Sequence, residues 1–242
     1  MLYLNLPSNS SMNYFQNNTL THYTTDLDGA WEIGLAEIQY PHNWHNVKNN
    51  EAWLNIHFYK ESELQKHLVL LPYGYYSSAK RIIKAIEGKM HRTKLKNKFH
   101  VAFNEINHKI DMKVKKDCQV IINPLLQSIL GFRQAIFPAG KYVSNWVANV
   151  KKGSNSLYVC CPLVEPRMVG DAQVPLLRIV PVAGRDGEMI TRVLDPIQYC
   201  PLLQRRFQTM EIDIRDDTGS MVPFERGRAV ATLHCRKRKE FP

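Results

Sequence analysis

The triplet Asp217-Thr218-Gly219, followed by Ser220, is the pattern in this 242-residue chain with the clearest potential for chemistry. Aspartic proteases carry this triplet, and their mechanism needs two such aspartates that face each other and share one proton. The chain contains one copy, so a second would have to come from a homodimer. Arg215 and Asp216 come directly before the triplet, whereas those enzymes bury the aspartate behind an apolar strand. Asp and Gly are also preferred in tight turns, and we expect a turn here, with no catalytic residue.

Metal binding is the second chemistry to consider. His42 and His45 are three residues apart and close to Glu37, and imidazole and carboxylate groups are common metal ligands. Pro41 interrupts the strand before them, and no third ligand has a sequence relation to the pair. The His/His/Glu set of the cupin metal enzymes cannot be assembled either. We therefore expect loop histidines, no metal and no cofactor.

Cysteine usage and hydropathy describe the expected environment. The cysteines are odd in number and have no C-x-x-C spacing, which indicates free thiols in a reducing compartment: Cys118, Cys160, Cys161, Cys200 and Cys235. No apolar run reaches the roughly 18 residues of a membrane-spanning helix, so we expect no membrane partner. The N-terminus has neither a basic segment nor a long apolar stretch, so we expect no signal peptide.

Positive charge is concentrated in two segments, although the net charge of the whole chain is only +10. The segment from Lys80 to Lys116 has twelve Lys/Arg against three acidic residues. Within it, Lys94, Lys96 and Lys98 alternate with other residues and would form a row of cations on a strand that could follow phosphates. The segment lacks the aromatic platform of single-strand binders, and an exposed loop leading to the strand at Phe99 is the alternative.

The second basic segment is Arg236, Lys237, Arg238 and Lys239, close to the last residue, Pro242. It directly follows an expected strand that ends at Cys235, so its root should be held while its end is free. Consecutive cations repel one another and suit an anionic partner, such as packaged DNA or an acidic patch on a neighbouring protein. A nuclear-import signal is the alternative.

Strand patterns dominate the chain. Apolar and polar residues alternate in several segments, and an Asp28-Gly29 turn separates the first two: 21–27, 30–40, 53–59, 98–103, 188–199, 209–215 and 227–235. Two segments have helical spacing with suitable caps, Ser77–Met90 and Asn123–Phe132. We therefore predict an all-β fold, an antiparallel sandwich or barrel with two short helices, in one domain over residues 1–242 with a basic tail at 236–242.

Three stretches together resemble a known family. They are Leu6–Val47, Val120–Phe132 and Met210–Arg236, which contain "LDGAWEIGLAEIQYPHNWHNV", "VIINPLLQSILGF" and "MEIDIRDDTGSMVPFERGRAVATLHCR". The pattern resembles the penton, or minor capsid, proteins of Maverick/Polinton-type elements and adintoviruses. The resemblance implies a single jelly roll, with five copies at each icosahedral vertex among double-jelly-roll major capsid proteins.

The same resemblance implies a function without catalysis. It indicates a structural virion protein that forms homopentamers and is found inside the host cell, in the cytoplasm or nucleus, during assembly. It transfers no catalytic residue to this chain. No long insertion between strands is evident from the sequence, so receptor binding stays open. A jelly-roll module that binds glycans or nucleic acid is the alternative function.

Overall fold

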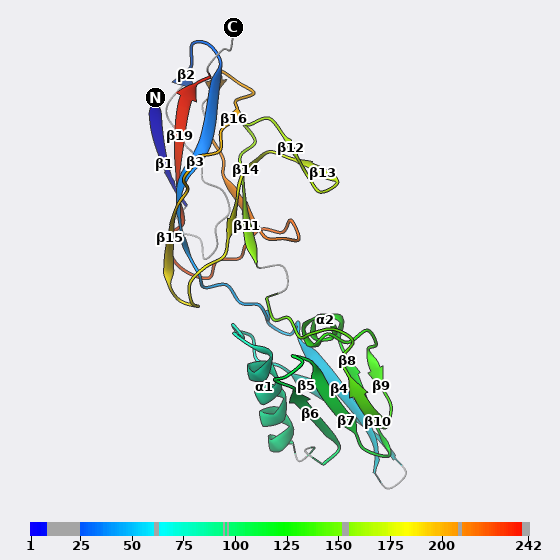
Figure 1. Ribbon diagram of the computed structural model, residues 1–242. Helices are drawn as coiled ribbons and strands as arrows, with labels where there is room; N and C mark the ends of the chain where they lie inside the picture. Colours follow the sequence, from blue (N-terminus) through cyan, green and yellow to red (C-terminus); the bar gives the residue numbers. More distant parts are fainter. Residues whose placement is uncertain are drawn as a thin grey trace. The chain divides into compact units, whose positions relative to one another are not determined.

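The computed structural model describes residues 1–8, 25–60, 63–93, 95, 97–151, 155–207 and 210–238. The chain forms two compact units (Figure 1). Met1–Trp44 and Gly153–Pro242 form the first, which we call the sandwich unit, and His45–Lys152 form the second, which we call the inserted unit. The sequence led us to expect one domain. Periodicity shows that a strand has a buried face, but not which core it covers, so the sequence pattern does not separate the strands at 53–59 and 98–103 from the others.

The sandwich unit contains two antiparallel sheets. Its larger sheet has the order β1-β19-β3-β15, with β16 also paired to β3, and the other has the order β14-β11-β18. Strands close in the sheet are far apart in the chain, since β1 pairs with β19. The larger sheet consists of β1 (Leu2–Pro7), β19 (Val230–Lys237), β3 (Trp31–Pro41), β15 (Met189–Val193) and β16 (Cys200–Pro201). The other sheet consists of β14 (Leu176–Pro181), β11 (Ser156–Cys160) and β18 (Asp213–Arg215).

Two short ladders complete this unit. Each is a pair of antiparallel strands of two or three residues. They are β12 (Arg167–Val169) with β13 (Ala172–Val174), and β2 (Thr25–Asp26) with β17 (Arg206–Phe207).

The core-facing residues of strand β3 change from odd-numbered to even-numbered positions halfway along its length. Ile33 and Leu35 are buried in the first half, and Ile38 and Tyr40 in the second, so the period-2 pattern slips by one residue. The cause is a bulge, because the register with β19 shifts between Thr232 and Leu233. An extra residue in one strand shifts the alternation by one position. The later side chains that face the core are therefore those that a regular strand would turn away from it.

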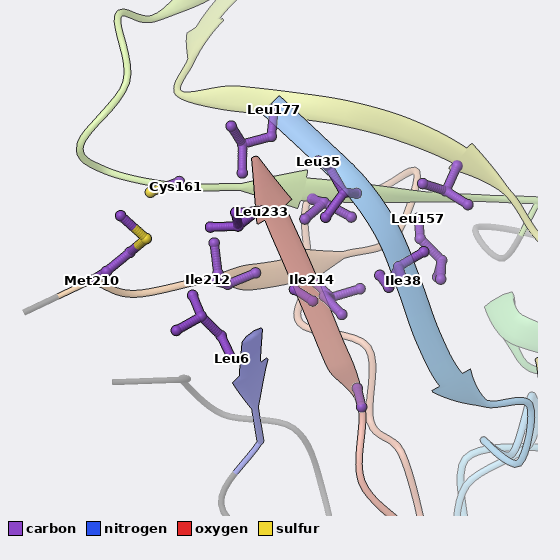
Figure 2. Packing of buried hydrophobic residues seen from close by; sticks show 14 of the residues in the cluster. Leu6, Leu35, Ile38, Leu157, Cys161, Leu177, Met210, Ile212, Ile214 and Leu233 are labelled. Atoms are coloured by element: carbon purple, nitrogen blue, oxygen red, sulfur yellow. The ribbon is translucent and has the colours of Figure 1, made fainter. Parts of the chain in front are cut away.

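The core of the sandwich unit lies between its two sheets (Figure 2). Leu35 and Ile38 of β3 and Leu233 of β19 lie on one side of this core, and Leu157 of β11 and Leu177 of β14 lie on the other. The predicted inward face of the segment before Ser220 is confirmed, since the side chains of Met210, Ile212 and Ile214 are all buried. The predicted fold class, an all-β jelly-roll sandwich with two short helices, is confirmed.

The inserted unit has its own sheets, helices and core. One sheet has the order β5-β4-β8-β9 and the other the order β10-β7-β6. The strands of the first are β4 (Trp53–Lys60), β5 (Glu63–Leu70), β8 (Cys118–Ile122) and β9 (Ile136–Phe137); those of the second are β6 (Phe99–Phe103), β7 (Ile110–Val114) and β10 (Gly140–Val143).

Both helices lie in the inserted unit, and both were predicted. Helix α1 (Ala79–Arg92) buries its apolar stripe, including Ile82 and Ile86. Helix α2 (Pro124–Leu130) begins where the side chain of Asn123 accepts a hydrogen bond from the Leu126 backbone N–H at 3.1 Å, and it ends at Gly131 in the left-handed conformation. Within the described residues, neither helix has the length and apolar character needed to span a membrane.

Candidate functional site

The Asp-Thr-Gly triplet lies in a turn, as predicted. The Asp216 N–H donates to the Ser220 carbonyl at 2.8 Å, and Arg215 forms an antiparallel bridge with Met221. The Asp216 carboxylate accepts from the Thr218 N–H at 2.8 Å and the Ser220 N–H at 3.1 Å. These bonds form an Asx-type turn, in which an aspartate side chain satisfies the backbone donors that the turn leaves unpaired.

Asp217 connects this turn to the beginning of β11. Its carboxylate accepts hydrogen bonds from the backbone N–H groups of Ser156 at 3.0 Å and Asn155 at 3.3 Å. The side chain is exposed at the rim of an open cleft of about 530 Å³, which also has the carboxylates of Asp171 and Asp213 in its lining. The geometry gives Asp217 a structural role, namely positioning the first residues of a core strand.

We predict that Asp217→Asn lowers the free energy of unfolding by less than about 1 kcal/mol, because the amide oxygen can replace the carboxylate oxygen that accepts from the Ser156 N–H, and only the longer bond from the exposed Asn155 N–H to the second oxygen is lost. Asp216→Ala should cost more, about 1–2 kcal/mol, because it leaves several donors of the turn without an acceptor. Denaturant unfolding of both variants checks the order. Peptide cleavage by the wild-type protein that disappears in Asp217→Asn would instead show that the aspartate is catalytic.

The two loop histidines belong to different units. His42 is buried in the sandwich unit against Trp44, with ring centroids 4.6 Å apart. His45 begins the inserted unit and contacts Tyr73, with ring centroids 5.7 Å apart. In the parts of the chain that the structure describes, no group of three His, Cys, Asp or Glu side chains is arranged to hold a metal ion.

All five cysteines are free and buried. Burial disfavours a thiolate, and it raises the pKa of Cys160 and Cys235 to about 11 and that of Cys161 to about 12. These thiols are therefore protonated at neutral pH and poorly nucleophilic.

We predict that a water-soluble disulfide reagent labels none of the five thiols in the native protein within minutes at pH 7.5, and all five in denaturant. Burial keeps the reagent away from the thiols, and the raised pKa keeps them protonated and therefore unreactive. The released chromophore gives the number of reacted thiols directly. Rapid native labelling of any of them would contradict the described packing.

Of the three alternating lysines of the first basic segment, the structure describes one. Lys94 and Lys96 lie outside the described residues, and β6 begins only at Phe99. Lys98 is half-buried just before β6, with its ammonium group 5.1 Å from the centre of the Phe58 ring. Contact of Lys94, Lys96 or Lys98 with an anion stays a prediction.

A different row of basic side chains crosses the sheet β10-β7-β6. His100 is paired with Lys113, and Lys113 with Lys141, and all three side chains are exposed. The next position along the sheet brings Lys115 beside Lys98, since the Lys115 N–H donates to the Lys98 carbonyl at 3.0 Å. We call these five residues the cationic face. Sequence reasoning missed it because the pairing register joins residues that are 13 to 28 positions apart in the chain.

The two units differ sharply in charge. Residues 45–152 contain 19 Lys/Arg and 7 Asp/Glu, a net charge of +12, whereas the rest of the chain contains 13 and 15, a net charge of −2. A local excess of one sign attracts ligands of the opposite sign. Any anionic partner should therefore be attracted first to the inserted unit.

The second basic segment is less free than expected. Strand β19 continues to Lys237, so Arg236 and Lys237 belong to the sheet opposite Glu32 and Trp31. The Arg236 guanidinium bonds the Glu32 carboxylate at 2.6 Å and lies over the Tyr199 ring, 3.6 Å from its centre.

The next two residues of the segment also form contacts, Lys237 through its side chain and Arg238 through its backbone. The Lys237 ammonium lies 3.7 Å from the Asp28 carboxylate. The Arg238 N–H donates to the Ala30 carbonyl at 2.8 Å, and Lys239 lies outside the described residues. A cation at the end of a strand can face a carboxylate on the neighbouring strand, which is why repulsion within the run does not keep it out of the sheet. Anion contact by these four residues stays a prediction.

Comparison with known proteins shows a similarity in fold and no match in sequence. The sequence matches no protein-family model and no curated protein. The structure is similar to the crystal structure of the mavirus penton protein, with a TM-score of 0.51 and 11% sequence identity. The similarity covers 96% of this chain and 97% of that chain, so it extends over both units. The chain therefore has a penton-like fold.

Proposed function

We propose that this chain is a penton, a structural minor capsid protein that forms homopentamers at the icosahedral vertices of a virus-like particle. The single observation that carries the proposal is the similarity in fold to the mavirus penton protein over nearly the whole of both chains. The sequence resemblance to pentons of Maverick/Polinton-type elements and adintoviruses points to the same role. Its neighbours would be double-jelly-roll major capsid proteins, its location the virion capsid, and its role assembly rather than catalysis.

A ring of five needs two different contact faces on each copy, because a head-to-tail interface joins unlike surfaces. The larger sheet of the sandwich unit has two unlike edges of this kind. Strand β1 exposes Leu2 and Tyr3 at one edge, and β15 exposes Met189 and Val193 at the other. Exposed apolar side chains at an interaction surface favour association. We infer that β1 of one copy contacts β15 of the next.

Mixing two face variants tests this arrangement. Tyr3→Asp and Val193→Asp should each abolish the ring, because each removes one of the two faces. An equimolar mixture of both should give a heterodimer and nothing larger, since only one intact pair of faces remains. Val143→Asp in the inserted unit, where the side chain is 56% exposed, is the matched control and should leave the ring intact. Intact rings in both face variants would contradict the proposed contact.

Packaged DNA is the further partner that the charge distribution supports. The cationic face and the last cations of β19 lie on different units, so each can be tested separately. A phosphate contact should show a slope of about one log unit of affinity per log unit of salt for each neutralised charge. Loss of DNA affinity in a variant of the cationic face, but not in Arg236→Ser, would assign DNA binding to the inserted unit.

A further inference from the structure

A cleft of about 510 Å³ runs between helix α1 and strand β6 in the inserted unit. One wall is the last part of α1, from Lys84 to Arg92, and the other is formed by Phe99, His100 and Val101. Side chains of consecutive strand residues point to opposite faces of a sheet. Since all three residues line the cleft, the cleft follows the edge of β6 rather than one face of the sheet.

Strand β6 is the outermost strand of its sheet. The order is β10-β7-β6, and among the described residues β6 pairs with β7 alone. Figure 1 shows α1 alongside β6 in this unit. An outer strand presents backbone N–H and C=O groups that another extended chain can pair with.

The hydrogen-bond alternation identifies which backbone groups of β6 face the cleft. The Lys115 N–H donates to the Lys98 carbonyl, and the Asn104 N–H donates to the Lys109 carbonyl. In an antiparallel pair, bonded and non-bonded positions alternate, so the even-numbered residues of β6 bond to β7. The backbone groups of Phe99, Val101 and Phe103 therefore point away from β7, toward the outer edge.

The walls of the cleft combine an apolar floor with a cationic rim. Met90 and Val101 are buried and supply the floor, and Phe99 lies beside them. The rim carries the exposed cationic side chains of Lys84 and Arg92 and one carboxylate, that of Glu87, and the imidazoles of His91 and His100 lie beside them. The cleft thus offers three kinds of contact: backbone pairing, a narrow apolar surface and positive charge.

We propose that this cleft binds an extended acidic peptide of a partner protein, which adds to the edge of β6 as a further strand. Main-chain pairing with an exposed edge and pockets for alternate side chains are the general features of such binding. Alternate side chains of the added strand would point to the apolar floor and to the cationic rim. The preferred sequence therefore alternates apolar residues with Asp or Glu.

A peptide fits these observations better than a polyanion does. Nucleic acids and sulfated glycans are charged along their whole length and suit an extended cationic surface. The inserted unit has such a surface in its cationic face, which shares only His100 with the lining of the cleft. Only a peptide uses the unpaired strand edge, and this inference goes beyond the proposed role in the shell.

Fluorescence anisotropy with the full chain and a labelled peptide tests the proposal. The probe is a set of octapeptides in which every second residue is Asp or Glu and the others are Val, Ile or Leu. Saturable binding is expected for members of this set, and a set with Lys in place of the acids should bind at least about tenfold more weakly. N-methylation of alternate residues on the edge that faces β6 should abolish binding, whereas methylation on the opposite edge should not. This control needs no change in the protein.

Charge reversals separate the cleft from the cationic face. Lys84→Glu combined with Arg92→Glu should weaken peptide binding by about tenfold, and Lys113→Glu combined with Lys141→Glu, the matched control, should change it by less than about threefold. The proposal is overturned if no acidic peptide of the set binds, or if N-methylation makes no difference. Displacement of bound peptide by single-stranded DNA, together with loss of binding in the Lys113/Lys141 variant alone, would assign the site to a polyanion instead.

Discussion

Ile212→Ala should lower the free energy of unfolding of the sandwich unit by roughly 2–5 kcal/mol, the usual cost of truncating a fully buried aliphatic side chain. Ile212 has no exposed surface and packs between the two sheets near Leu6, Met210 and Leu233 (Figure 2). The cavity left by the lost atoms adds to the lost hydrophobic transfer energy. Denaturant unfolding of the full chain, monitored by hydrogen exchange, measures this loss of stability.

The neighbouring residue supplies the control for this experiment. Glu211 is half-buried and lies outside both hydrophobic clusters, so Glu211→Ala should cost less than about 1 kcal/mol. The faster hydrogen exchange caused by Ile212→Ala should be confined to the sandwich unit, because the inserted unit has its own core. Equal effects of the two substitutions would mean that the register of this segment is wrong.

Gly131→Ala should lower the free energy of unfolding by about 2–4 kcal/mol, by combining backbone strain with a steric clash. Gly131 ends α2 with a φ of +79°, and a methyl group there would lie 2.3 Å from the Trp146 carbonyl oxygen. That carbonyl is held in place because it accepts a hydrogen bond from the Ser144 hydroxyl at 2.7 Å. The backbone near Trp146 would have to move.

Gly219→Ala is the matched control for the clash. Gly219 has nearly the same conformation, with a φ of +81°, but a methyl group there would have no atom within 4 Å. The substitution should therefore cost only the left-handed strain, about 1–2 kcal/mol. Thermal unfolding of the two variants compares the costs. If both lose the same stability, the contact between α2 and the segment at Trp146 is not as described.

Local signals explain which parts of the fold could be predicted. Asn123, Pro124 and Gly131 mark the two ends of α2, and the turn at Asp217 follows from residues within five positions of it. Long-range pairing explains what could not be predicted. The bulge in β3 depends on its partner β19, and the extension of β19 to Lys237 depends on Glu32 and Asp28 about 200 residues earlier.

For the candidate sites, too, the local sequence shows one part and long-range pairing determines the rest. The basic segment from Lys80 to Lys116 was visible in the sequence, but its functional geometry was not. The cationic face needs the register that joins His100, Lys113 and Lys141, and the cleft needs the position of α1 beside the edge of β6. Charge density is a property of sequence, whereas a surface or a cleft is a property of pairing and packing.

Native mass spectrometry of the full chain at micromolar concentration is the most direct test of the penton role. It gives the number of copies in the assembly without any assumption about the contact faces. The proposal predicts a discrete species of five times the chain mass, which dissociates in the Tyr3→Asp and Val193→Asp variants. A stable dimer, or a monomer that stays monomeric when added to shells of the major capsid protein, would contradict it.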